Sequence, residues 1–331
     1  MRTATAIADS NIALAKYWGK RAYAGNYPAV PSLSVTLDGL ATTTTVSFEG
    51  GLLVDELVLD GETQEGKSLD RVVGLLDRVR ASMKSPCFAR VVSSNNFPTA
   101  SGLASSASGF AALAAASTRA AGLDFDLGRV SDLARRSSAS AARSIFGGYV
   151  SLAAGPCSAT VESLAAAPFA NADALDMRVL VCVVTEATKK IGSTDAMRLT
   201  AQVSPFYDAW IAFAPVQYAS IAEGVLRGDF ANVGRAAEAS ALAMHASAFA
   251  AGIVYGTEST FGLLRSVQAL RDNGFAIFAT MDAGPHVKVL VQSANAAEVR
   301  ALLEASGFVL RVIDTSPSPF GVRFCGDGAT P

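Results

Sequence analysis

The chain of 331 residues is long enough for one large domain or two ordinary ones; half of its residues are apolar and 17% are charged, which excludes a largely disordered protein. The formal net charge of −2 excludes the basic footprint of a nucleic-acid-binding protein, although a few local cations could still hold an anionic small molecule. The four cysteines are scattered without paired spacing, which argues against a zinc site or a disulfide framework and indicates a reducing cytoplasm.

No stretch resembles a targeting or membrane-spanning segment. The N-terminal MRTATAIADSNIALAKYWGK lacks the long apolar core of a signal peptide. The most membrane-like run, LASSASGFAALAAA, is too short and consists of residues too small for a spanning helix. We therefore expect a soluble cytoplasmic protein with no membrane partner.

The first part of the chain mixes strands with helices. β-Branched and alternating residues predict strands at 11–20, 33–37, 42–48, 56–60, 87–94 and 147–154. Apolar residues at helical spacing predict helices at 68–83, 105–121 and 126–145.

A loop rich in Ala, Pro and Asn near residue 170 predicts a boundary between two domains, 1–170 and 171–331. Beyond it, strands are predicted at 177–185, 275–282, 287–292 and 308–315, and helices at 194–228, 229–251, 258–273 and 296–306. This alternation predicts an α+β sandwich with helices on one face of the sheet.

The stretch NNFPTASGLASSASGFAAL at 95–113 places Pro98, Gly102 and the pair Ser105–Ser106 directly before a run of helix formers. Small residues here would let backbone N–H groups approach a polyphosphate at the positive end of the helix, where serine hydroxyls could bind phosphate or a metal ion. The stretch lacks the Lys-Ser/Thr pair of a P-loop and the G-x-G-x-x-G of a dinucleotide fold. A capped alanine-rich helix without a ligand explains the residues equally well, so both interpretations remain open.

The segment NIALAKYWGK at 11–20 contains two lysines in an otherwise apolar run. In a strand, Lys16, Trp18 and Lys20 would project to the same face. Two cations on one face of a half-buried segment would require an anion. The alternative is an edge strand whose lysines reach solvent, which the segment alone slightly favours.

The segment ARRSSASAARSIFGGYV at 134–150 combines serines with arginines. On a helix, Ser140 would neighbour Arg143 at i,i+3 and Arg136 at i,i+4, and an arginine fork suits a phosphate or a carboxylate. Because Arg143 sits among apolar residues, we expect it to face inward with a partner. We expect Arg135 to be an ordinary surface residue.

Two further segments carry candidate polar residues. MDAGPHV at 281–287 places Asp282 at the end of a predicted strand, where it is either a catalytic group or, as the segment alone favours, a cap of the following turn. KKIGSTDAM at 189–197 offers Ser193 and Thr194, residues common at helix starts. We expect His245 to lie on a helix face and not to be a ligand.

Together and in this order, these segments resemble the mevalonate diphosphate decarboxylase family, within the GHMP superfamily of small-molecule kinases that includes galactokinase, homoserine kinase and mevalonate kinase. They span residues 11–285. NIALAKYWGK and NNFPTASGLASS are close to diagnostic for the decarboxylases, whereas PxxxGLxSS alone marks the superfamily. The resemblance implies a two-lobed α+β fold, with a ribosomal protein S5 domain 2-like N-terminal lobe, a ferredoxin-like C-terminal lobe and the active site between them, and it suggests a homodimer.

The resemblance also implies the reaction. ATP and Mg²⁺ would serve to phosphorylate the tertiary 3-hydroxyl of mevalonate 5-diphosphate, and loss of that phosphate and of CO₂ would leave isopentenyl diphosphate. Because hydroxide is a poor leaving group, its conversion into phosphate makes the elimination possible, while developing positive charge at C3 favours a nearby carboxylate and excluded water.

By the same resemblance, Asp282 would hold or deprotonate the 3-hydroxyl, and Lys16 would lie near that hydroxyl and the transferred phosphoryl group. Asn11 would orient neighbouring side chains, and Arg143 would bind the substrate carboxylate. The phosphate end of the substrate would contact Tyr17, Lys20, Ser138, Ser140 and Ser193. The nucleotide loop would comprise Pro98, Gly102, Leu103, Ala104, Ser105 and Ser106, with Ser105 also beside the metal ion.

Several residues depart from the family pattern. Ser137 and Ala139 stand where glycines are usual, and their added Cβ atoms could tighten the pocket around the distal phosphate. Ala22, Pro31 and His286 also differ. These departures leave a 5-monophosphate substrate and a mevalonate 3-kinase as alternatives. A ligand-sensing relative without turnover is a third, although a sensor would not need Lys16, Arg143 and Asp282 together.

Overall fold

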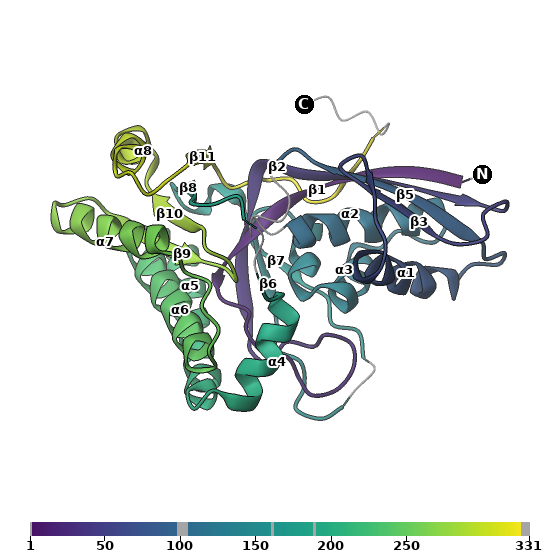
Figure 1. The fold of residues 1–331 in the computed structure, drawn as a ribbon, viewed down its shortest axis with the longest axis horizontal. Coiled ribbons are helices and arrows are strands. Elements are labelled where there is room, and N and C mark those ends of the chain that lie inside the picture. The colour runs from purple at the N-terminus through teal and green to yellow at the C-terminus, as the bar shows by residue number, and fades with distance from the viewer. Residues whose placement is uncertain (1, 98–104, 160–161, 188–189, 326–331) are drawn as a thin grey trace.

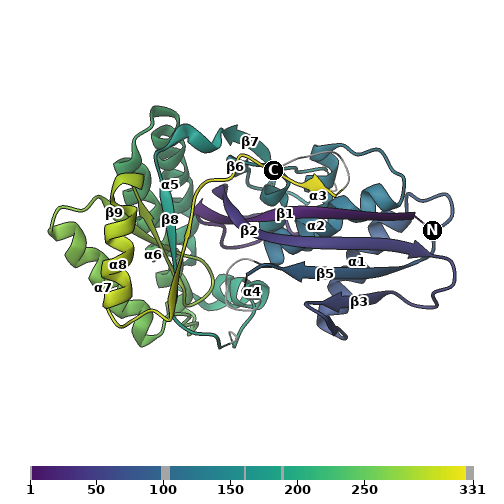
Figure 2. The ribbon, with the colours of Figure 1, turned by 90° about the horizontal axis from the view of Figure 1, so that it is seen from above.

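The computed structural model describes residues 2–97, 105–159, 162–187 and 190–325. Two sheets and their helices make up these residues, and Figures 1 and 2 show the smaller sheet with its helices at one end of the long strands β1 and β2. The mixture of helices and antiparallel strands confirms the predicted α+β class. Among the described helices, none has both the length and the apolar character that crossing a membrane requires.

The larger sheet has eight strands in the order β12-β1-β2-β5-β3-β4, with β6 paired to β2 and β7 to β6. All of its pairs are antiparallel except β3 with β5. The strands are β1 (Arg2–Ala15), β2 (Ser32–Glu49), β3 (Glu56–Leu59), β4 (Glu62–Thr63), β5 (Phe88–Asn95), β6 (Tyr149–Leu152), β7 (Ala167–Ala170) and β12 (Arg323–Phe324).

Strand β2 joins the two strands predicted at 33–37 and 42–48 into one of 18 residues. The Asp38-Gly39 pair between them has the composition of a turn, but it forms an irregularity within the strand, where Asp9 pairs with Ala41 and Asn11 with Thr36. Gly39 there has φ +71°, a backbone conformation that glycine adopts without strain. The residues of β2 before this irregularity pack with the smaller sheet, and those after it pack under the helices that cover the larger sheet.

Helices α1 (Lys67–Arg80), α2 (Ser105–Ala120) and α3 (Leu127–Ser137) cover one face of the larger sheet (Figure 1). Their apolar residues and those of β1, β2 and β5 form one buried cluster. Alanines dominate the part of α2 within this cluster, which allows the helix to lie close to the strands. The helix predicted over 126–145 is wrong beyond Ser137, because Ser138 is extended and a 3₁₀ segment, η1 (Ala139–Ile145), follows.

The smaller sheet has the order β11-β8-β10-β9 and is antiparallel throughout. Its strands are β8 (Arg178–Val183), β9 (Ile277–Met281), β10 (Val287–Val291) and β11 (Arg311–Thr315). Helices α7 (Glu258–Asp272) and α8 (Ala296–Ala305) pack on one face. The other face packs on α5 (Tyr207–Arg227), α6 (Phe230–Ala250) and the ends of β1 and β2, so the prediction of helices on one face was incomplete.

The helix predicted over 194–228 is two helices, α4 (Ser193–Val203) and α5. Ser204 and Pro205 separate them, because proline disfavours helical backbone at the residue that precedes it. The short segments η2 (Ala172–Ala174) and η3 (Ser293–Asn295) are single 3₁₀ turns. All four cysteines are free thiols, as their scattered spacing predicted.

After β11 the chain returns to the larger sheet, where β12 pairs with β1. Arg323 binds the buried Asp9 carboxylate through both terminal nitrogens, at 2.9 and 2.8 Å, and Ser318 donates to it at 2.8 Å. The last strand is therefore attached to the first half of the chain by charge as well as by pairing. The division into domains at residue 170 stays a prediction.

We expect Arg323→Gln to destabilise the fold, because it leaves the buried Asp9 carboxylate without its cation. Since Arg323 itself is 30% exposed, we expect a loss of about 2–3 kcal/mol in the free energy of unfolding, below the range for a fully buried pair. Urea unfolding measures this loss. The control, Arg227→Gln, breaks a surface pair on α5 and should cost at most ~0.5 kcal/mol; equal losses in both variants would contradict the role given to Asp9.

Candidate active site

Asp282 directly follows β9, and its carboxylate lies between two lysines from different parts of the chain. Lys16 Nζ, just beyond the end of β1, is 2.8 Å from Oδ1, and Lys288 Nζ, on β10, is 3.2 Å from Oδ2. Both lysines are almost fully buried, whereas 24% of the Asp282 side chain is exposed. The carboxylate is therefore held from within the protein and remains approachable from outside.

The backbone around this ion cluster is also fixed. Lys16 Nζ donates to the Ala13 carbonyl at 2.7 Å, and the backbone N–H of Lys16 donates to Ser240 Oγ on α6 at 3.0 Å. The Asp282 carbonyl accepts from Gly284 N at 2.7 Å and from His245 Nε2 at 3.1 Å. The turn that caps β9 thus uses the backbone of Asp282, so the carboxylate is available for other contacts, contrary to the capping role that the segment alone favoured.

Burial and charge act against each other in this cluster. Burial raises the pKa of Asp282, but Lys16 and Lys288 overcome that effect and hold its pKa well below the ordinary value. Burial lowers the pKa of Lys16, while Asp282 opposes the shift. His245 is nine-tenths buried beside the two lysines, and burial lowers its pKa to about 4; it is therefore neutral at pH 7 and donates through Nε2.

Arg143, on η1, faces inward with a partner, as predicted. It is 1% exposed, and its Nη1 donates to Ser32 Oγ at 2.7 Å. Its Nε has no hydrogen-bond partner among the described residues. Burial lowers its pKa to about 10, which Asp282 opposes, so Arg143 remains a buried cation with a donor still available for a ligand.

Asn11, within β1, contacts the same 3₁₀ segment. Its Nδ2 donates to the Ser140 carbonyl at 3.1 Å and to Ser144 Oγ at 2.7 Å. Asn11 thereby fixes η1, the segment that carries Arg143. The orienting role that the resemblance implies for Asn11 stays a prediction.

The prediction that Lys16, Trp18 and Lys20 share one strand face is wrong, because β1 ends at Ala15. Trp18 is buried and meets Tyr255 edge-on. Lys20 Nζ instead donates to Asn26 Oδ1 at 2.7 Å and to Thr194 Oγ1 at 3.1 Å. Burial, with a contribution from Arg71, lowers the pKa of Lys20 to about 8, so a nearby anion would favour its charged form.

The other residues predicted at the phosphate end lie on segments next to Arg143 and Lys20. Ser138 Oγ and Ser140 Oγ are 3.2 Å apart, and Ser193 is the first residue of α4, after the cap Gly192. The Tyr17 hydroxyl is buried without a hydrogen-bond partner among the described residues, and burial raises its pKa. The i,i+4 relation predicted for Arg136 and Ser140 is wrong, because the helix ends between them.

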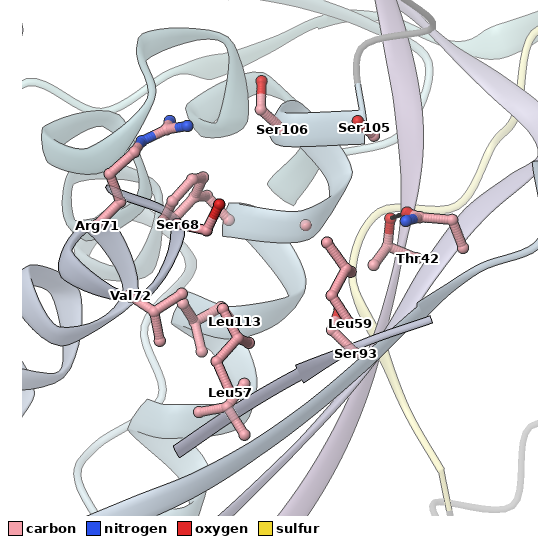
Figure 3. Close-up of a pocket in the computed structure, with 14 residues that line it drawn as sticks. Thr42, Leu57, Leu59, Ser68, Arg71, Val72, Ser93, Ser105, Ser106 and Leu113 are labelled. Atoms are coloured by element: carbon pink, nitrogen blue, oxygen red, sulfur yellow. Dashed lines mark hydrogen bonds between the residues drawn. The ribbon is translucent and has the colours of Figure 1, made fainter. Parts of the chain in front are cut away.

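A pocket of about 200 Å³ lies in the larger lobe between α1, α2 and the strands β3 and β5. Figure 3 shows Arg71 of α1 and the serines Ser105 and Ser106, in the first turn of α2, at one end of it. Apolar side chains including Leu57, Val72 and Leu113 lie at the other end. The structure thus places both predicted serines at a cavity; Pro98, Gly102, Leu103 and Ala104 lie outside the described residues.

Several residues of this region were missed or misjudged. Arg135 is buried and not a surface residue: it contacts Asp132 and stacks over the Tyr27 ring at 4.1 Å. Lys288 was missed, although a lysine inside the apolar run VKVLVQ is itself a signal, because buried lysines require a partner. His245 lies on a helix as expected, but its contact with Asp282 depends on tertiary packing and had no signal in the sequence.

Comparison with known proteins agrees with this geometry. Residues 8–165 match the family model described as the diphosphomevalonate decarboxylase-like N-terminal domain, and residues 179–313 match the mevalonate 5-diphosphate decarboxylase C-terminal domain. The diphosphomevalonate decarboxylase of Candida albicans is 32% identical, over 92% of this chain and 88% of that protein.

Solved structures give the same result. The mevalonate diphosphate decarboxylase of Staphylococcus aureus is 33% identical with a TM-score of 0.91, over 98% of each chain. A protein called MDDEF, solved in complex with MVAPP, AMPPCP and magnesium, is 35% identical with a TM-score of 0.90, again over 98% of each chain. These similarities cover both lobes and the elements that carry Lys16, Arg143 and Asp282, so this chain belongs to the diphosphomevalonate decarboxylase family.

Proposed function

We propose that this protein catalyses the ATP-dependent decarboxylation of mevalonate 5-diphosphate to isopentenyl diphosphate, ADP, phosphate and CO₂, in the cytoplasm. The observation that carries the proposal is the charge of the site: Lys16, Lys288 and Arg143 are buried around one carboxylate, Asp282. Three cations against one carboxylate leave an excess of positive charge in a largely buried site, which favours the binding of anionic groups.

The excess positive charge suits two anionic groups of the reaction, the substrate carboxylate and the phosphoryl group that is transferred to the 3-hydroxyl. The Arg143 fork, with its Nε free of partners among the described residues, can bind the substrate carboxylate in the bidentate manner that arginine favours. Lys16 can stabilise charge on the phosphoryl group as it transfers to the 3-hydroxyl. Asn11 holds η1, and with it Arg143, in place.

Asp282 supplies negative charge where the reaction develops positive charge. Its pKa lies well below the ordinary value because of the two lysines, so it is ionised at any pH at which the enzyme would work. The ionised carboxylate can therefore orient the 3-hydroxyl and stabilise developing positive charge at C3.

The phosphate end of the substrate would lie near Tyr17, Lys20, Ser138, Ser140 and Ser193. The methyl group of Ala139, one of the departures from the family pattern, packs in an apolar cluster with Ala142, Val150 and Leu152. It therefore forms part of the core of that lobe, against which Tyr17 also packs. The 5-diphosphate is favoured as substrate because the similar protein MDDEF was solved in complex with MVAPP, AMPPCP and magnesium.

The pocket beside α2 fits a nucleotide. Its apolar end suits a base, and Ser105, Ser106 and Arg71 at the other end suit phosphates, aided by the positive start of a 16-residue helix. No group of three or more metal-ligating side chains occurs in the described parts of the chain; Mg²⁺ would be held mainly by nucleotide phosphates and water, with Ser105 beside it. ATP supplies the phosphoryl group that makes the 3-oxygen a leaving group.

The proposed reaction is tested by incubating the protein with ATP, Mg²⁺ and, separately, mevalonate, its 5-phosphate and its 5-diphosphate. We expect ADP and CO₂ in equal amounts with the 5-diphosphate and at most a few per cent of that rate with the others. ADP without CO₂ would indicate a mevalonate 3-kinase, and a preference for the 5-monophosphate would indicate a phosphomevalonate decarboxylase. If none of the three compounds gave ADP or CO₂, the protein would be a ligand-sensing relative without turnover.

We expect Asp282→Asn to lower kcat by about 10²–10³-fold, because it removes the charge that stabilises the transition state. Nucleotide affinity should be retained, since Asp282 does not line the pocket beside α2. Steady-state kinetics and calorimetry with a non-hydrolysable ATP analogue measure the two quantities. An unchanged kcat would refute the role given to Asp282.

We expect Ser105→Ala to raise the KM for ATP about tenfold and to change the KM for the second substrate little, since one hydrogen bond to a charged group contributes about 1.5–3 kcal/mol. Ser117→Ala is the matched control: Ser117 lies in the same helix and donates only to the Leu113 and Ala114 carbonyls. If both variants showed parental ATP kinetics, Ser105 would have no role in nucleotide binding and would only form the start of α2.

A further inference from the structure

Lys288 is a buried lysine that none of the sequence motifs includes and that the proposed reaction uses only as part of the positive charge around Asp282. It is the second residue of β10, is 1% exposed, and has only apolar residues on either side in the strand. A buried ammonium group is costly unless it is paired. Its placement in this strand therefore needs a reason, and its Nζ is 3.2 Å from Asp282 Oδ2.

The two lysines contact different oxygens of the Asp282 carboxylate. Lys16 pairs with Oδ1 and Lys288 pairs with Oδ2. The exposed quarter of the Asp282 side chain does not include Oδ2, which is buried and has no hydrogen-bond partner among the described residues, so Lys288 acts on it as a charge at 3.2 Å. Lys288 thus approaches the carboxylate from the protein interior, on the side that a substrate cannot reach.

Two lysines at different carboxylate oxygens restrict the orientation of the Asp282 carboxylate more than one lysine could. A single cation leaves a carboxylate able to rotate about the Cβ–Cγ bond, whereas cations at both oxygens define its plane. The Asp282 backbone is already held by Gly284 and His245. Rotation of the carboxylate about the Cβ–Cγ bond is then the remaining freedom, and Lys288 restricts that rotation.

We propose that Lys288 is a positioning residue of this active site, which holds Asp282 Oδ2 so that the carboxylate meets the substrate in one orientation. The inference rests on the proposed function, because it concerns the orientation of Asp282 in that reaction. The other groups that face the cluster are Lys16 after β1, Arg143 on η1, His245 on α6 and the hydroxyl of Tyr17. Among these, only Lys16 contacts the carboxylate oxygens at a distance that the structure gives, and it holds Oδ1.

The test is a double-mutant cycle between Lys288 and Asp282. Because misplacing a catalytic group by about 1 Å can cost about 10²-fold, we expect Lys288→Met to lower kcat at least tenfold, with the KM for ATP and for mevalonate 5-diphosphate within threefold of the parent. In an Asp282→Asn background the same change should lower kcat less than threefold, since residues that act through one another are non-additive. Lys288→Arg, which keeps the charge, should recover part of the lost kcat.

Thr280→Val is the matched control. Thr280 pairs with Lys288 across β9 and β10, and its hydroxyl has no hydrogen-bond partner among the described residues, so the variant changes the same pair of strands and removes no hydrogen bond. We expect its kcat to stay within twofold of the parent. Thermal unfolding of every variant shows which of them are folded at the assay temperature.

Equal losses from Lys288→Met in both backgrounds, or an equal loss in Thr280→Val, would show that Lys288 only supports the fold and would overturn the inference. Parental kcat in Lys288→Met would overturn it as well. A parent protein that released no CO₂ would instead overturn the proposed function, so the two failures are distinguishable.

Discussion

The pairing of Asp282 with Lys16 and Lys288 is the constraint on which the site depends. Lys16 follows a strand of the larger sheet, whereas Asp282 and Lys288 belong to the smaller one. Charges that leave water must find partners at close distance. The two sheets must therefore meet in one arrangement, because any displacement between them would separate the buried ammonium of Lys16 from its carboxylate.

Apolar packing makes that arrangement rigid. A single buried cluster includes Ile12, Leu14 and Val35 of the larger sheet together with residues of α5, α6, β8 and β10. Such a core is as dense as an organic crystal and resists sliding. The hydrogen bond from Trp210 to the Trp18 carbonyl, at 2.7 Å, adds a directional contact just beyond Lys16. The lobes thus share a core instead of meeting at a polar interface, which keeps the charged groups at fixed distances.

Sequence patterns predicted the α+β class and most elements, because strand and helix periodicities are local properties. They failed where tertiary contacts decide the backbone. Nothing local ends β1 at Ala15, so Lys16 and Lys20 were placed on one face, although Lys16 contacts Asp282 and Lys20 contacts Asn26 and Thr194. Asp38-Gly39 has turn composition, but pairing on both sides keeps it within β2.

The candidate residues divide in the same way. Asn11, Lys16, Arg143 and Asp282 were found through motifs, and the structure brings them close together, but their individual roles remain proposals. The misjudgement of Arg135 has a physical cause, since helical spacing says which residues share a face and not whether that face is covered. Lys288 could have been found from its apolar surroundings, whereas its partner could be identified only from the pairing of β9 with β10.

The attachment of Arg323 to Asp9 has a consequence for the order in which the molecule can form. These residues are 314 positions apart, so during synthesis Asp9 lacks its cation until Arg323 has been added. Contacts of such long range form late and slow the completion of a fold. The larger sheet includes β1, yet every strand of the smaller sheet is synthesised before β12, the edge strand that pairs with β1, is available.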